Sequence, residues 1–278
     1  MEIKFLGTGA AEGVPSIFCK CKYCQAIREA GASEYRSRTQ VLIDGILSVD
    51  FPPEGYVNSL KFGHNLADLK YLLVTHSHMD HFYAHDFILR GYKYAEFEEP
   101  KLNIYGNNEV FAVFNECTAR EMKPEVRPNI QFNVISPYVD FQMGEYRVIT
   151  IPAQHSTTED ALLFYIEKDK KGYLHLHDTG RISYEALKFL SDKGVKADVV
   201  AFDCTFINHT AGNVSRHMGI EDNMIVKAKL YDLGIIDRNT DLIITHFSHH
   251  ANPCHANLAE VEKKYLVKAA YDGMTVFI

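Results

Sequence analysis

Short apolar stretches rich in β-branched and aromatic side chains recur along the chain and alternate with segments of helical periodicity. Stretches of this kind indicate β-strands, because such side chains pack well on a pleated surface. The predicted strands cover residues 3–6, 40–43, 46–50, 71–75, 102–105, 131–135, 146–151, 161–167, 172–176, 199–202, 241–245 and 274–278.

Apolar residues spaced three and four apart predict helices over residues 83–93, 109–121, 183–193, 220–233 and 257–269. Ser183 and Asn257 begin two of these segments, and we expect both to be N-caps. Each half of the chain starts with strands and then alternates strand with helix. This order favours an α+β fold of two mixed sheets packed together, with helices outside. Because no linker-like or low-complexity tract interrupts the pattern, we expect a single domain over residues 1–278.

Composition and charge narrow the class of protein. Hydrophobic residues make up 46% of the chain and charged residues 23%, which is typical of a globular protein rather than a disordered one. The formal net charge of −7 argues against a nucleic-acid partner, since such proteins usually carry a basic surface. With neither a signal-peptide pattern nor an apolar stretch of membrane-spanning length, we expect a cytoplasmic protein without a membrane partner. A homodimer is compatible with these observations.

Four side chains of the metal-binding type stand within six residues, directly after the predicted strand 71–75. They are His76, His78, Asp80 and His81. Alternate residues of an extended segment point to the same side, so His76 and His78 can reach one point. Asp80 and His81, which we expect at the start of the following helix, can reach a second point nearby. Imidazole and carboxylate groups suit zinc, manganese or iron, so the motif predicts parts of two adjacent metal sites.

The pattern His-x-His-x-Asp-His resembles the signature of the metallo-β-lactamase superfamily, and the resemblance extends over nearly the whole chain. That resemblance implies a four-layer αββα sandwich holding two divalent metal ions, zinc or manganese, at the sheet edges. It also implies that His155 joins the first site, Asp178 bridges both ions and His246 completes the second site. His175 and His177 alternate with Asp178 and should face the other side of their strand, so we leave both out of the metal site.

The resemblance also implies a mechanism, in which a hydroxide bridging the two metal ions attacks a phosphodiester. Asp178 would hold this hydroxide and Asp80 would help to position it. In the phosphodiesterase branch of the family, a histidine in a His-x-Gly setting after an Asp-x-Thr-Phe segment serves the leaving group. Here the segment from Asp203 to Phe206 precedes His217-Met218-Gly219, so His217 is the expected counterpart.

A second cluster consists of Cys19, Cys21 and Cys24. Three thiolates at this spacing can bind one tetrahedral zinc ion and leave a position for a distant fourth ligand. The loop 19–24 resembles the structural zinc site of the phosphoribosyl cyclic phosphate phosphodiesterases, which a histidine three residues after the last active-site histidine closes. By this resemblance His249 is the fourth ligand, and the site contributes to folding rather than turnover. His250, Cys254 and His255 stand close enough in the sequence to compete for that position.

Taken together, these motifs favour a metal-dependent hydrolase acting on a small phosphodiester, with cyclic phosphates as the preferred class. A ribonuclease Z-like enzyme has similar ligands, but it carries an RNA-binding arm, and no Gly/Pro-rich insertion of that kind is evident. The pyrroloquinoline quinone biosynthesis protein, a carrier or non-hydrolytic enzyme, has a similar cysteine loop but a degraded active-site motif. β-Lactamases and thiolester hydrolases lack this combination of cysteines and His217.

Overall fold

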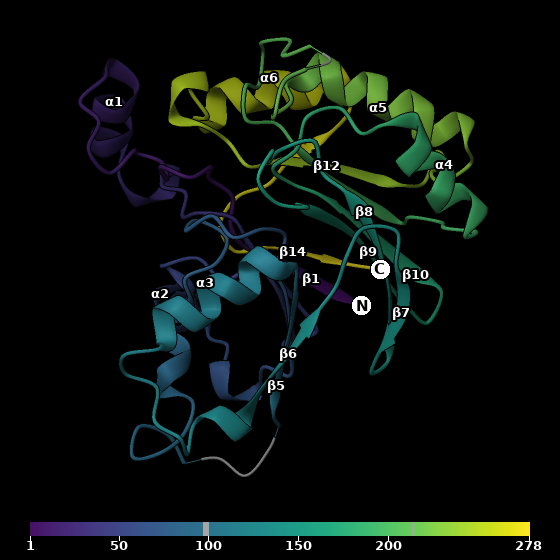
Figure 1. Cartoon of the computed structure of the whole chain (residues 1–278). Helices are drawn as coiled ribbons and strands as arrows, with labels where there is room; N and C mark the ends of the chain where they lie inside the picture. The colour runs from purple at the N-terminus through teal and green to yellow at the C-terminus, as the bar shows by residue number, and fades with distance from the viewer. Residues whose placement is uncertain (97–99, 213) are drawn as a thin grey trace.

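The computed structural model describes residues 1–96, 100–212 and 214–278. Two seven-stranded sheets face each other, and helices cover their outer sides (Figure 1). The first sheet has the order β14-β1-β2-β3-β4-β5-β6 and the second the order β13-β12-β11-β10-β9-β8-β7. This is the αββα sandwich expected from the sequence.

The first sheet consists of β1 (Glu2–Gly7), β2 (Gln40–Ile43), β3 (Leu47–Val49), β4 (Tyr71–Leu73), β5 (Leu102–Gly106), β6 (Ile130–Val134) and β14 (Met274–Phe277). The second consists of β7 (Asp140–Met143), β8 (Tyr146–Pro152), β9 (Leu162–Lys168), β10 (Lys171–Leu176), β11 (Val199–Asp203), β12 (Asp241–Thr245) and β13 (Lys268–Ala269). The α-helices are α1 (Lys22–Ala30), α2 (Gly55–Phe62), α3 (Asn108–Thr118), α4 (Tyr184–Asp192), α5 (Ile220–Asp232) and α6 (His255–Tyr265).

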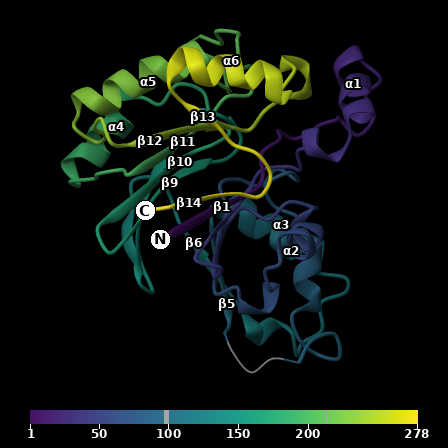
Figure 2. The same cartoon turned by 180° about the vertical axis from the view of Figure 1, so that it is seen from behind.

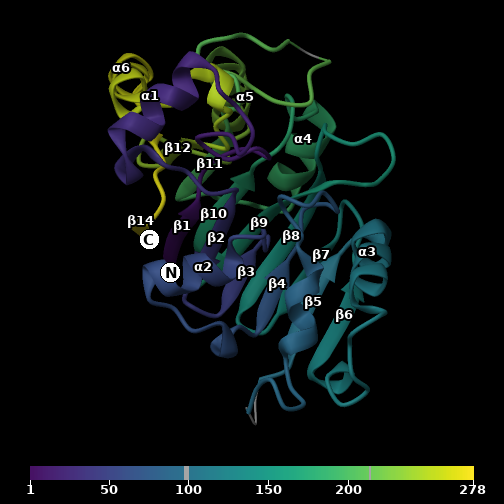
Figure 3. The same cartoon turned by 90° about the vertical axis from the view of Figure 1, so that its left-hand side faces the viewer.

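The alternation of side chains along the strands divides the interior into layers. In β10, Tyr173 belongs to the core between the two sheets, whereas Leu174 and Leu176 belong to the core under the helices. Figure 2 shows α4, α5 and α6 along the outer side of the second sheet, and Figure 3 shows α2 and α3 against the first. The chain ends lie side by side, and the Met1 amino group donates to the carbonyl oxygen of Ile278 at 2.8 Å.

Every predicted strand is present. The sequence pattern did not predict β7, a partly exposed segment of four residues, or β13, which has two residues. The helices predicted over 109–121, 183–193 and 220–233 are α3, α4 and α5. Ser183 is the N-cap of α4, since its side chain accepts from the backbone N–H of Ala186 at 3.1 Å.

Two helix predictions were wrong in part. Residues 83–93 form only a 3₁₀-helix, Ala84–Leu89, which is followed by left-handed backbone at Gly91 and Tyr92. Asp80 and His81 therefore lie in a turn and not at a helix start. Asn257 is no N-cap, because α6 already begins after Cys254.

The end of α6 and two further helices also differ from the pattern. α6 ends before Leu266, whose φ of 54° is left-handed, and the chain then joins the sheet as β13. The sequence pattern did not predict α1 and α2. The buried side of α2 consists of Gly55, Asn58 and Ser59, so this helix has no apolar periodicity to detect.

Strand direction brings the chemically interesting segments to one edge. The strands β10, β11 and β12 are parallel, and β8 runs in the same direction because β9 is antiparallel to both β8 and β10. His155, Asp178 and His246 follow β8, β10 and β12, so all three lie at the carboxyl edge of the second sheet. Among the described residues, no helix has both the length and the apolar composition needed to cross a membrane.

Candidate metal centre and active site

The first group of potential metal ligands lies where β4, β8 and β10 end. The ligand atoms of His76, His78, His155 and Asp178 all lie within 4.8 Å of one another. Nε2 of His76 is 2.9 Å from Nδ1 of His78, and Nδ1 of His155 is 3.0 Å from Oδ1 of Asp178. Three of these residues are buried, while His78 is exposed, so the group opens to solvent on one side.

The second group shares Asp178 with the first. Asp80, His81, Asp178 and His246 are all buried, and their ligand atoms also lie within 4.8 Å of one another. Nε2 of His81 is 3.2 Å from Oδ2 of Asp80 and 3.0 Å from Oδ2 of Asp178. All seven residues singled out in the sequence therefore converge, in the two sets that the motif and the resemblance implied.

The residues of both groups fit divalent metal ions. Nε2 of His81, Nε2 of His246 and Nδ1 of His155 are buried and face oxygens of Asp178, but none of these contacts has hydrogen-bond geometry. Cations between these side chains would satisfy the buried nitrogens. Burial lowers the pKa of His76 well below its ordinary value and so keeps this imidazole in the neutral, ligating form. Imidazole nitrogen with carboxylate oxygen is a donor set for zinc or manganese.

The backbone at two of these residues is strained. Asp178 has a φ of 55° and His246 a φ of 61°, left-handed values that non-glycine residues rarely adopt. Such conformations persist where the surrounding structure enforces them, often at functional sites. Here His246 directly follows β12 and Asp178 lies two residues after β10, and their side chains enter the two groups.

Sequence reasoning missed the residues that orient the ligands. Asp50, at the end of a predicted strand, has its Oδ2 2.6 Å from Nδ1 of His81. Thr205 has its hydroxyl 2.9 Å from Nδ1 of His246, and Oδ2 of Asp203 is 3.3 Å from the same nitrogen. In the sequence, Asp203 and Thr205 stand out only as part of the motif before His217. The sequence signal available for Asp50 was an aspartate at the end of an apolar predicted strand.

His217 lies at the edge of the second group. Its Nδ1 is 2.9 Å from Oδ1 of Asp178 and 3.4 Å from Oδ2 of Asp203, and its side chain is 28% exposed. Burial would lower the pKa of this imidazole, but the two carboxylates outweigh burial and raise that pKa to about 10. His217 also lies within ligand distance of Asp178, Asp203 and His246. Its partial exposure sets it apart from the buried residues of that set.

The two groups open into a cavity of about 540 Å³. His78, Asp80, His155, Asp178 and His217 are among the residues lining it. A neighbouring cavity of about 410 Å³ shares His155 and is lined by hydroxyl and guanidinium groups, those of Ser156, Thr157, Ser183 and Arg216. Both cavities thus have charged and hydrogen-bonding side chains in their walls, which a charged ligand requires.

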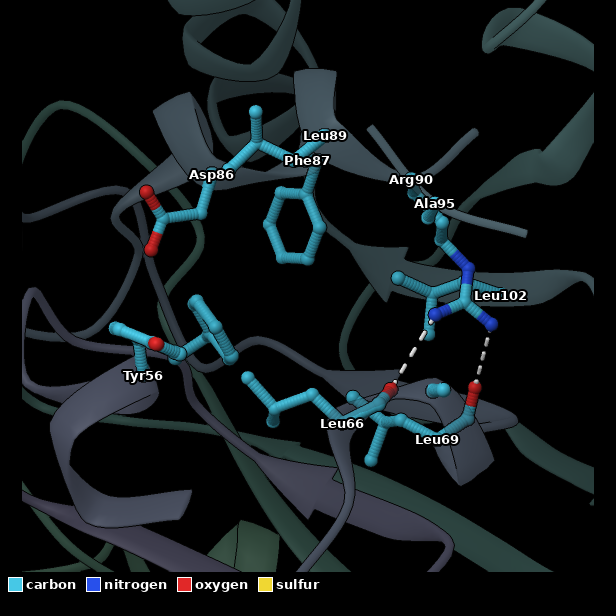
Figure 4. A pocket seen from close by; sticks show the side chains of 11 residues that line it. Tyr56, Leu66, Leu69, Asp86, Phe87, Leu89, Arg90, Ala95 and Leu102 are labelled. Carbon is cyan, nitrogen blue, oxygen red and sulfur yellow. Dashed lines mark hydrogen bonds between the residues drawn. The ribbon is translucent and has the colours of Figure 1, made fainter. Parts of the chain in front are cut away.

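A third cavity, of about 290 Å³, has a different character (Figure 4). It is lined mostly by apolar side chains such as Phe51, Phe87 and Leu102, and Arg90 at its edge donates hydrogen bonds to the carbonyl oxygens of Leu66 and Leu69. None of its described lining residues belongs to the His/Asp groups. The polar cavity is therefore the candidate active site.

The cysteine cluster is closed by a histidine. The ligand atoms of Cys19, Cys21, Cys24 and His249 lie within 4.8 Å of one another, with Nδ1 of His249 at 3.2 Å from Sγ of Cys24. The competing residues lie elsewhere. His255 contacts Glu34 at 3.0 Å, and His250 and Cys254 are outside the group of four.

The thiols of this cluster differ in acidity. The backbone N–H of Cys24 is the largest influence on Cys21 and lowers the pKa of that thiol to about 6, whereas burial raises the pKa of Cys24 to about 11. Cys21 is therefore the more readily ionised, and the thiolate is the form that binds zinc.

Comparison with known families places the chain in a class. Residues 39–247 match the profile described as "Beta-lactamase superfamily domain", so the chain belongs to this superfamily. The protein thus combines the metallo-β-lactamase fold with His/Asp groups that could hold metal ions.

Particular relatives are distant. The octanoyltransferase of Porphyromonas gingivalis is 22% identical over an alignment of 285 positions that covers 100% of this chain and 52% of that protein, so the chain spans about half the length of this relative. A diphosphatase of the PhnP family superimposes with a TM-score of 0.72 at 18% identity, covering 100% of this chain and 97% of that one. Zinc-bound PqqB from Methylobacterium extorquens gives 0.71 at 17% identity, with 100% of both chains covered. The short form of human tRNase Z gives 0.65 at 19% identity, covering 100% and 99%. At these identities the structures show a common fold.

Proposed function

We propose that this protein is a metal-dependent phosphodiesterase that hydrolyses a small phosphodiester, with cyclic phosphates as the preferred class. The observation that carries the proposal is the position of His217, with Nδ1 2.9 Å from the shared Asp178 and its ring lining the polar cavity. A hydrolase of this kind needs a proton donor beside the metal centre, and the position of His217 supports this role.

Each ligand group has a defined part in this proposal. His76, His78 and His155 would hold one divalent ion, and Asp80, His81 and His246 the other, with Asp178 shared. Two such ions, when bound, lower the pKa of a water molecule and stabilise charge on the oxygens of a phosphate ester.

His217 would supply the proton that the departing alkoxide needs. Partial exposure of the side chain gives it access to a bound ester, and the carboxylates of Asp178 and Asp203 beside Nδ1 favour a proton on this ring. Asp203 accepts from the backbone N–H of Met218 at 2.9 Å, and its other oxygen faces Nδ1 of His217. Asp203 thus contacts both the His217 ring and the loop that carries it. These contacts would orient His217 for proton transfer.

The character of the two cavities supports a small anionic substrate. The chain carries a net charge of −7, so an anion needs local cations; besides the two metal ions, Arg216 would supply one from the neighbouring cavity. The fold shared with a diphosphatase supports chemistry at phosphorus. The shared fold with tRNase Z raises RNA processing as a second candidate, but the acidic charge does not favour it.

We further propose that Cys19, Cys21, Cys24 and His249 hold one structural zinc ion. Their donor set is that of closed tetrahedral zinc sites, and the lowered pKa of Cys21 supplies one thiolate near neutral pH. The protein would then bind three metal ions, two of them in the active site.

The proposed activity is tested with purified protein supplied with manganese, zinc or nickel. The substrates are linear and cyclic phosphodiesters, a dinucleoside diphosphate, a β-lactam and an octanoyl thiolester. We expect cleavage of phosphodiesters by the wild type and none by Asp178→Asn. Cleavage of the lactam or the thiolester, with every phosphate ester left intact, would overturn the proposal.

A further inference from the structure

One wall of the active-site cavity comes from the N-terminal loop. Ala10, Ala11 and Glu12 line the cavity together with the His/Asp ligands. This loop is paired with the segment after His246: the N–H of Ala10 donates to the carbonyl oxygen of Phe247 at 3.0 Å, and the N–H of Phe247 donates to that of Thr8 at 2.9 Å. The wall is therefore fixed to the segment that delivers a ligand.

The Glu12 carboxylate makes a second connection to the same segment. Its Oε1 accepts from the hydroxyl of Ser248 at 2.6 Å and from the backbone N–H of His249 at 3.2 Å. The same oxygen is 3.8 Å from Nε2 of His249, an electrostatic contact longer than a hydrogen bond. The Glu12 side chain is 29% exposed. It lines the cavity and also lies beside His249 of the cysteine cluster.

The orientation of His249 makes this contact meaningful. Its Nδ1 faces the thiols, at 3.2 Å from Sγ of Cys24, while Nε2 faces Glu12. Nδ1 can bind a metal ion only when the ring proton is on Nε2, and a carboxylate beside Nε2 favours that tautomer. A carboxylate that accepts a hydrogen bond at this nitrogen orients a metal-bound histidine and strengthens metal binding, and the charge of Glu12 acts in the same direction over the longer distance.

We infer that Glu12 is a positioning residue that couples the Cys19/Cys21/Cys24/His249 site to the active-site cavity. A zinc ion at the thiols would hold His249 in place. His249 and Ser248 would then hold Glu12, and Glu12 with its loop would hold the cavity wall. The zinc site would thus contribute to ligand binding in the active site as well as to folding. The inference goes beyond the proposed hydrolysis, since it concerns how two metal sites communicate.

The chain offers a matched control for Glu12. Glu34 also contacts a histidine through its carboxylate, with Oε2 3.0 Å from Nδ1 of His255. Neither Glu34 nor His255 is among the residues that line the active-site cavity or form the cysteine group in the described part of the chain. Glu34→Ala therefore removes a comparable carboxylate–imidazole contact without touching the proposed connection.

The metal side of the inference is tested by cobalt substitution. Cobalt bound to thiolates gives a charge-transfer band that cobalt at the His/Asp ligands does not give, so this band reports on the cysteine site alone. We expect Glu12→Ala to lose the band to EDTA about tenfold faster than the wild type, in line with the effect of carboxylates behind ligating histidines. Glu34→Ala should release cobalt at the wild-type rate. Wild-type release from Glu12→Ala would overturn the inference.

The cavity side is tested by calorimetric binding of inorganic phosphate to the fully metal-loaded protein. Because Glu12→Ala and Glu12→Gln remove the same negative charge from the cavity wall, the two are compared with each other: we expect a higher phosphate Kd for Glu12→Ala than for Glu12→Gln, while two metal ions stay at the His/Asp groups. In Glu12→Gln the amide oxygen can still accept from Ser248, so phosphate affinity should be largely rescued while cobalt release stays fast. Should Glu12→Ala fail to fold, the cobalt release of Glu12→Gln decides. Faster cobalt release from Glu12→Ala with the same phosphate affinity as Glu12→Gln would overturn the coupling.

Discussion

Oδ2 of Asp50 lies 2.6 Å from Nδ1 of His81, and both side chains are almost completely buried. Oδ1 of Asp50 accepts from the backbone N–H of Thr75 at 2.8 Å, so the carboxylate is tied to the start of the His76 motif as well. This contact keeps the proton of His81 on Nδ1 and leaves Nε2 free to face Asp80 and Asp178. Asp50 therefore selects the tautomer of a metal ligand.

Replacing Asp50 should weaken the second metal site. In Asp50→Asn, we expect the affinity for the ion at Asp80, His81 and His246 to fall about 10- to 100-fold, because His81 loses its orienting charge. Titration of the metal-free protein with manganese or zinc measures this affinity. Asp192→Asn, which alters an exposed aspartate paired with Lys188, is the control. Equal affinities in both variants would exclude this role for Asp50.

The His217→Ala variant should separate proton donation from metal binding. We expect turnover of esters with alkoxide leaving groups to fall roughly 10²- to 10⁴-fold, the usual contribution of a general acid, with metal content unchanged. Turnover of 4-nitrophenyl esters should fall much less, because 4-nitrophenolate departs without being protonated. Comparing the two ester classes in one assay checks the prediction. Unchanged turnover of the alkoxide esters would remove His217 from the mechanism.

The convergence of the seven His/Asp residues could be predicted because each one follows a strand or lies in one compact motif. The ends of β8, β10 and β12 meet at one edge, so ligands at those ends are neighbours whatever the loops do. The apolar alternation that marks these strands is local and strong, since β10 and β11 are buried along almost their whole length.

The residues that support the ligands could not be predicted in the same way. Asp50 and His81 are 31 residues apart, and Glu12 and Ser248 are 236 apart, so their contacts depend on how the sheets pack. The interpretation of residues 83–93 as an α-helix failed for a related reason. Phe82 forms a β-bridge with Phe51, which leaves only the short 3₁₀-helix before the left-handed turn at Gly91.

The Cys21→Ser variant should release one equivalent of zinc and lower the melting temperature. The reason is that a three-ligand remnant binds zinc more weakly, and metal binding at such sites stabilises the folded state. Metal analysis after gel filtration, together with thermal unfolding, measures both effects. Cys117→Ser in α3, outside the cysteine group, is the control. Full zinc content in Cys21→Ser would contradict the structural site.

The buried carboxylate of Asp222 should make stability depend on pH. It accepts from the N–H groups of Ala211 at 2.8 Å and Gly219 at 3.0 Å, and it pairs with Arg181 at 2.7 Å. Burial raises the pKa of Asp222, but these partners outweigh burial and hold the pKa below its ordinary value. Because the folded-state pKa lies below the unfolded one, about 3.9, this stabilisation is present above about pH 4 and is lost as the pH falls through the folded-state pKa.

Asp222→Asn should therefore lower the free energy of unfolding at pH 7 by about 3 kcal/mol, since it removes a buried charge that pairs with Arg181 and accepts from two backbone N–H groups. The difference from the wild type should shrink at pH 3. Urea unfolding at both pH values measures this difference. The control is Asp241→Asn, which alters a partly exposed pair with Lys268 and should change stability by less than about 1 kcal/mol. A wild-type unfolding curve for Asp222→Asn at pH 7 would contradict this account.

Anomalous diffraction from crystals grown with manganese or zinc tests the central claim most directly. We predict two peaks about 3.5 to 4 Å apart on either side of Asp178, one beside His76, His78 and His155 and the other beside Asp80, His81 and His246. In the zinc crystals a third peak should lie among Cys19, Cys21, Cys24 and His249. A single ion or none at the His/Asp groups would contradict the dinuclear centre on which the proposed hydrolysis depends.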